Sequence, residues 1–122
     1  MLRLPPQNFT VPSGRDHEEE ILFTDADGAP LDLTGGLVLF EAQAGNQDSD
    51  TADLIEKSSA EGTIEILDQT VTATKGRCTV LFVPADTTDL DQSVLEHEAT
   101  AIDFLGRTWR GPVGAMTVLS NV

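Results

Sequence analysis

The sequence has very little cysteine, few aromatic residues and few basic residues. Its 122 residues include one Cys, one Trp, five Phe and no Tyr. One Cys excludes a disulfide within the chain and a metal site made of several thiolates. Cys78 lies in an apolar run, so we expect it to be a small buried hydrophobe, and a free thiol is typical of proteins that fold in a reducing cytoplasm. With so few aromatic side chains, the core must consist mainly of Val, Ile and Leu.

Positive charge is also scarce. Seven basic residues accompany 21 acidic ones, and the formal net charge is −14. A surface of this sign repels phosphate groups, which argues against nucleic acids and anionic membranes as partners. Long apolar runs are missing as well: none could span a bilayer, and the N-terminus has no signal-peptide core. The charge therefore predicts either a solvated surface or attraction to a basic partner.

Short apolar segments alternate with turn signals about every ten residues along the chain. This spacing predicts one all-β domain, an immunoglobulin-like antiparallel β-sandwich of about seven strands, with no long helix. The segment at 84–90, a proline followed by small and acidic residues, breaks the β-pattern and predicts one short helical turn. The strand at 37–43 lacks alternation at its start, which indicates burial on both faces. The expected strands cover residues 18–25, 37–43, 54–57, 63–68, 70–73, 77–83, 94–103 and 108–119.

Residues 1–17 are expected to form an extended N-terminal arm, and residues 18–122 to form the sandwich domain. Prolines in the arm exclude a helix, while Phe9 and Val11 could anchor an edge strand. We expect contacts with another chain to order the arm, with Leu2, Leu4 and Phe9 as its apolar anchors.

Two acidic segments are candidate metal sites, but both have a simpler interpretation. Asp25-x-Asp27-Gly28 could begin a calcium loop, yet the closing Glu is missing because the twelfth position is Gly36. A plain turn is the expected structure there. Clustered carboxylates at residues 45–53, which include Asp48, Asp50 and Asp53, are typical of a solvated loop. We therefore expect no metal and no cofactor.

No group of residues indicates catalysis. His17 and His97 are far apart in the sequence, and His97 lies on the expected core face of its strand, where a hydrogen-bonded structural role is favoured. Cys78 lacks the local context of a nucleophile, although a Cys–His pair is possible in principle. Gly35 and Gly36 precede a strand rather than a helix, so they do not form a phosphate loop. The chain is expected not to be an enzyme.

Arg107 and Arg110 flank Trp109, the only Trp in the chain. Trp and Arg are enriched at interface hot spots, so these residues are candidates for partner binding. Because strand positions alternate, Trp109 could equally fill the core between two solvated arginines. The sequence leaves both interpretations open.

The order of the turns and strands over residues 7–120 resembles a family of small phage virion proteins. The elements are Asp-Ala-Asp-Gly-x-Pro at 25–30, x-Asp-Leu-Thr-Gly at 31–35, a glycine with an apolar run at 76–83, Pro-Ala-Asp-Thr-x-x-Leu at 84–90, a long strand at 95–103 and Gly-Arg-x-x-x-Gly at 106–111. The pattern is similar to the immunoglobulin-like domain at the N-terminus of phage baseplate upper proteins.

This resemblance implies a non-enzymatic virion structural protein, made in the host cytoplasm and present in multiple copies per particle. It implies an adaptor or decoration module that binds tail, baseplate, neck or capsid subunits through its arm, loops and edge strands. The family implies no catalytic or cofactor residues. The alternative is a carbohydrate-binding or cell-surface-binding β-sandwich, a class that usually exposes several aromatic side chains.

Overall fold

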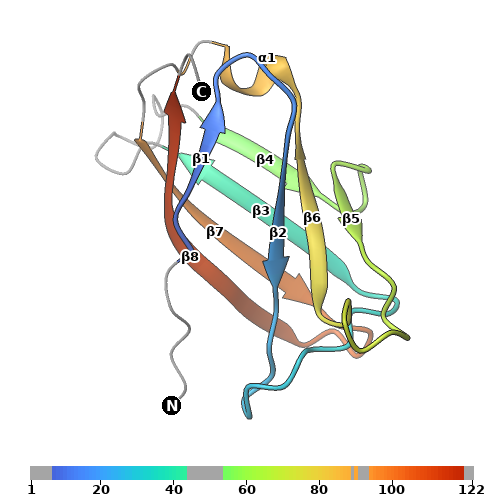
Figure 1. Cartoon of the computed structure of the whole chain (residues 1–122). Coiled ribbons are helices and arrows are strands. Elements are labelled where there is room, and N and C mark those ends of the chain that lie inside the picture. Colours follow the sequence, from blue (N-terminus) through green and yellow to red (C-terminus); the bar gives the residue numbers. More distant parts are fainter. Residues whose placement is uncertain (1–6, 44–53, 89, 91–93, 120–122) are drawn as a thin grey trace.

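The computed structural model describes residues 7–43, 54–88, 90 and 94–119 (Figure 1). Within these residues the chain forms eight strands and a single short helix. The turn chemistry expected from the sequence separates most of these elements. Their bounds are β1 Phe9–Pro12, β2 His17–Leu22, β3 Leu37–Gln43, β4 Leu54–Ser58, β5 Ile64–Ile66, β6 Arg77–Phe82, α1 Pro84–Thr87, β7 Val94–Ile102 and β8 Thr108–Leu119.

The strands form two sheets (Figure 1). A five-stranded sheet has the order β1-β8-β7-β3-β4, and a three-stranded sheet has the order β2-β6-β5. Neighbouring strands are antiparallel except β1 and β8, which pair in parallel. The fold is thus mostly β, as the turn spacing predicts, with one mixed sheet.

One hydrophobic core joins the two sheets. Phe40 of β3 meets Phe82 of β6 edge-on, with ring centroids 5.8 Å apart. On β7 the buried positions are alternate residues, as expected for a strand with one face on the core. Aliphatic side chains dominate the core, as the composition predicts. Its buried hydrophobic members are Val11, Ile21, Phe23, Leu31, Leu33, Val38, Phe40, Ala42, Ile55, Ile64, Cys78, Val80, Phe82, Leu90, Leu95, Ala99, Ala101, Met116 and Val118.

Burial on both faces at the start of β3 was expected from the sequence, and the structure corrects this. Val38 and Phe40 face the core and are almost fully buried, whereas Leu37 and Leu39 are only half-buried. The leucines lie on the outer face of the five-stranded sheet, so only neighbouring side chains on that face cover them. Apolar residues on both faces of a strand therefore do not require a layer on each side.

The strand expected at residues 70–73 is wrong, because these residues form turns. Asp68 Oδ1 accepts the backbone N–H of Thr70 at 2.9 Å, and the backbone N–H of Lys75 donates to Val71 O at 2.9 Å. Gln69 Oε1 accepts the backbone N–H of Gly76 at 2.9 Å. Local side-chain hydrogen bonds of this kind compete with strand pairing, and here they hold the segment as a loop.

Part of the expected arm belongs to the domain itself. Phe9–Pro12 is β1, which pairs with residues 116–119 of β8 as an edge strand of the five-stranded sheet. Val11 is fully buried in the core, and Phe9 packs against it. Gln7 is held too, because its backbone N–H donates to Val113 O at 2.9 Å. Residues 7–12 are therefore integrated into the fold.

Candidate partner-binding site

The apolar residues expected to anchor the arm on another chain do not form an exposed patch among the described residues. Leu2 and Leu4 lie outside those residues. Phe9 lies within the domain, where its ring centroid is 4.9 Å from that of His97 and 6.2 Å from that of Phe82. The structure thus gives Phe9 a packing role inside its own chain.

The carboxylate of Asp103 holds the turn between β7 and β8 together. Its Oδ1 atom accepts the backbone N–H groups of Leu105 and Arg107, both at 2.9 Å. Its Oδ2 atom accepts Nε of Arg107 at 2.8 Å and Nε1 of Trp109 at 2.9 Å. Gly106 supplies the left-handed residue of the turn, with φ of 84°. The turn is therefore rigid, because one buried carboxylate fixes three residues.

Trp109 lies on the core side of the five-stranded sheet. It is half-buried against the core, and Ala101, the residue of β7 with which it pairs, is fully buried. The guanidinium of Arg107 lies 5.6 Å from the Trp109 ring centroid. The Arg107 side chain is 63% exposed. Arg110 is exposed and pairs with Thr100 of β7. The core interpretation thus describes where Trp109 lies, while both arginines remain accessible.

The same turn carries two exposed apolar side chains. The sequence predicted the turn but gave these two residues no role in binding. Phe104 is 78% exposed and Leu105 is 69% exposed, more than the other large hydrophobic residues that the structure describes. Asp103 and Gly106 already satisfy the turn, so the positions between them could be polar. Large apolar residues at such positions are the available sequence signal for an interaction surface. We call Phe104 and Leu105 the apolar tip.

The ionised state of Asp103 is expected to stabilise the fold in a pH-dependent way. The hydrogen bond from Trp109, helped by the N–H groups and charge of Arg107, lowers the pKa of Asp103 from 3.8 to about 2 despite burial of the carboxylate. Because the pKa is depressed in the folded state, the contribution is complete above about pH 4 and is lost as the pH falls toward about 2.

Thermal unfolding of the wild type and of Asp103→Asn between pH 6 and pH 2 measures this contribution. The melting temperature of the wild type should exceed that of the variant at pH 6, and the gap should close as the pH falls. A gap that stays constant over this range contradicts the assignment.

The outer face of the five-stranded sheet is hollowed beside a bulge in β8. The hollow has a volume of about 570 Å³. Val113 and Ala115 of β8 give it an apolar side, and the acidic side chains of Glu41, Glu96 and Glu98 also line it. Gln43, His97 and Gly114 complete the lining.

Two of the glutamates that line the hollow, Glu41 and Glu98, belong to a row of three glutamates across neighbouring strands. Glu98 of β7 is paired with Glu41 of β3, and Glu41 is paired with Glu56 of β4. All three are exposed, and within the described residues none of them forms an ion pair. Like charges at directly opposite positions repel each other. A cationic group brought to this face would relieve that repulsion.

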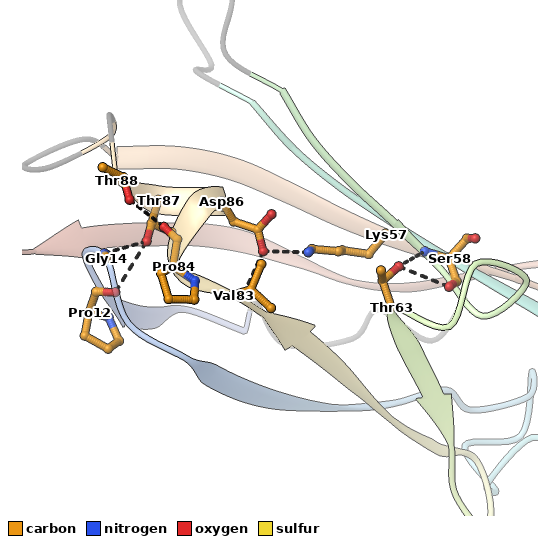
Figure 2. Close-up of polar contacts among 10 residues, drawn as sticks. All are labelled: Pro12, Gly14, Lys57, Ser58, Thr63, Val83, Pro84, Asp86, Thr87 and Thr88. Atoms are coloured by element: carbon orange, nitrogen blue, oxygen red, sulfur yellow. Dashed lines mark hydrogen bonds and ion pairs between the residues drawn. The ribbon is translucent and has the colours of Figure 1, made fainter.

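The Pro-Ala-Asp-Thr segment has a structural role at the end of the sheets opposite the β7–β8 turn (Figure 1). Asp86 of α1 accepts the backbone N–H of Val83 at 2.8 Å and pairs with Lys57 Nζ at 2.6 Å (Figure 2). Lys57 is only 7% exposed, so Asp86 neutralises a buried charge. The pair therefore ties α1 to β4.

Thr87 ties the same helix to the connection between β1 and β2 (Figure 2). Its side chain is fully buried, and its Oγ1 atom accepts the backbone N–H of Gly14 at 2.9 Å. Ser13 Oγ donates to the carbonyl of Thr87 at 3.2 Å. The contacts of Asp86 and Thr87 therefore stabilise the fold.

The candidate nucleophile and bases are also in structural contacts. Cys78 is fully buried, and burial raises the pKa of its thiol to about 12. His97 Nε2 lies 2.6 Å from Gln7 O, so this nitrogen donates, and burial lowers the pKa of the ring. His17 lies 3.1 Å from Glu19. The burial of Cys78 and the hydrogen bond of His97 agree with the structural roles expected for these two residues.

In the part of the chain that the structure describes, no group of three or more His, Cys, Asp and Glu side chains is arranged to hold a metal ion. Asp25 Oδ1 accepts the backbone N–H groups of Asp27 and Ala29, as in a plain turn. The acidic loop with Asp48 and Asp50 lies outside the described residues. No helix among the described elements is long and apolar enough to cross a membrane.

Comparisons of the chain with protein-family models, with curated proteins and with solved structures found no match.

Proposed function

We propose that this protein is a non-enzymatic structural protein of a phage particle. In this proposal it is an immunoglobulin-like adaptor or decoration module that binds tail, baseplate, neck or capsid subunits. The observation that carries the proposal is the strand order, β1-β8-β7-β3-β4 in one sheet and β2-β6-β5 in the other.

This order supports the immunoglobulin-like assignment. A variable-type immunoglobulin domain has strands G, F, C and C′ in one sheet and strands B, E and D in the other. Lettering β2 to β8 in chain order as B, C, C′, D, E, F and G gives the same neighbours in both sheets. The sequence pattern that resembles baseplate domains therefore has a compatible topology.

The side chains support binding rather than catalysis. The polar groups of Asp86, Thr87 and Asp103 and the Nε2 atom of His97 are engaged in internal contacts, whereas the apolar tip is exposed on a rigid turn. Rigid surfaces lose little entropy on docking. The carbohydrate-binding alternative has weaker support, because every aromatic side chain except Phe104 is buried or half-buried.

Particle composition tests the proposal. Phage particles from a strain that carries this gene are purified on a density gradient, washed with salt and analysed by quantitative peptide mass spectrometry. We expect the chain to sediment with the particles at a fixed ratio to the major virion proteins. An unrelated host protein of similar size and charge is the control for adsorption. Recovery of the chain only in the unassembled fraction would refute the proposal.

A further inference from the structure

We propose that the apolar tip of one copy of this protein docks into the hollow on the outer sheet face of a second copy. The inference rests on the proposed function only in taking the domain to be a structural module. It names the surfaces through which neighbouring copies contact each other.

The tip has the properties of an interface core. Phe104 and Leu105 project from a turn that the Asp103 carboxylate fixes through four hydrogen bonds. Beneath the tip, the Phe104 ring lies over Gly35, with its Cδ2 atom 3.1 Å from where a side chain on that glycine would begin. Both tip residues are uncharged, and the paired Asp103 carboxylate and Arg107 guanidinium lie on either side of them in the turn. Apolar centres with arginine nearby are typical of protein interfaces.

The hollow has matching properties. Its volume of about 570 Å³ lies within the range of pockets that accept compact ligands, about 300–1,000 Å³, so two apolar side chains fit. Val113 is 47% exposed there and offers an apolar contact to the tip. Glu41 and Glu98 offer carboxylates for the exposed arginines of an incoming copy.

Geometry excludes a contact between the tip and the hollow of the same copy. The tip is about 15–20 Å from Glu98 along β7, and the hydrogen bonds of Asp103 keep the turn from folding back. Different surfaces of the two copies thus meet, and such a contact builds rings or open filaments. Repulsion between the domains, each of net charge −14, is screened beyond about 8 Å at physiological salt, whereas the arginine–glutamate contacts act within that distance.

Analytical ultracentrifugation of the purified full chain tests the inference, from about 10 µM to about 1 mM at physiological salt, the range of weak transient contacts. We expect association that grows with concentration beyond a dimer. Phe104→Ser with Leu105→Ser should weaken it at least about tenfold, because hot-spot residues contribute at this scale. Val71→Ser, which alters another exposed valine in a different turn, is the matched control and should associate as the wild type does.

Two complementary variants test whether tip and hollow meet. The tip variant keeps its hollow, and Val113→Lys blocks the hollow but keeps its tip. Neither should associate alone, and an equimolar mixture should form a one-to-one dimer and nothing larger. Melting temperatures verify that each variant is folded, and Leu105→Ser alone replaces the double variant if the latter is not. A wild type that is monomeric at about 1 mM, a tip variant that associates normally, or a mixture that stays monomeric overturns the inference. None of these outcomes changes whether the chain is found in particles.

Discussion

Removal of residues 1–12 is expected to lower the free energy of unfolding by about 3–5 kcal/mol. The truncation removes β1 and with it Val11, which is fully buried, and Phe9, which packs against the core. Burial of one such side chain contributes about 1.5–3 kcal/mol. His97 also loses the carbonyl of Gln7, to which its Nε2 donates. Because domains have about 5–15 kcal/mol in total, this loss is a large share of the stability of the folded state.

Urea unfolding of the full chain, of a chain lacking residues 1–6 and of a chain lacking residues 1–12 measures this effect. The shorter truncation keeps every described residue and is the matched control, so its midpoint should remain near that of the full chain. If removal of residues 1–12 leaves the midpoint unchanged, β1 is an accessory arm rather than a part of the core.

Asp86→Ala is expected to cost about 3–5 kcal/mol of stability. The substitution leaves Lys57 charged, 7% exposed and without the carboxylate that lies 2.6 Å from its Nζ atom. It also removes the acceptor for the backbone N–H of Val83 at the start of α1. A buried charge that loses its partner is far more costly than the absence of the whole pair.

The double variant Lys57→Met with Asp86→Ala separates these contributions. It removes the buried charge together with its partner, so it should be more stable than Asp86→Ala alone and recover most of the loss. Chemical unfolding of the wild type, the two single variants and the double variant gives the coupling energy. Equal stability of Asp86→Ala and the double variant would show that Lys57 does not need its partner.

The local structure was largely predictable because strand and turn signals lie close together in the sequence. The strands at 37–43 and 108–119 have the predicted bounds, and the helical turn at Pro84 occurs as predicted. On β7 the alternating side chains place Leu95, His97, Ala99 and Ala101 on the buried face, as expected. In each case the residues that decide the structure are within a few positions of one another.

Long-range pairing was not predictable in the same way. Phe9–Pro12 pairs in parallel with a strand more than a hundred residues away, so its place in the sheet depends on a contact that no local pattern specifies. At residues 70–73 the β-branched composition favoured a strand. Hydrogen bonds that the Asp68 and Gln69 side chains accept from the backbone instead hold these residues in turns.

The candidate site was only partly predictable. The sequence singled out Arg107, Trp109 and Arg110 by composition, and the structure places all three near the β7–β8 turn. The sequence did not single out Phe104 and Leu105, because their exposure depends on the turn that Asp103 fixes. The hollow on the sheet face could not be predicted either, since it needs the register of three neighbouring strands and a bulge in β8.

Cryo-electron microscopy of purified phage particles from a strain carrying this gene tests the central proposal most directly. We expect density for several copies of a two-sheet domain of this size on the particle, in which the β7–β8 turn of each copy contacts the outer sheet face of the next. Particles in which every density is accounted for by other proteins, or in which the domain exposes Phe104 and Leu105 to solvent, contradict the proposed account.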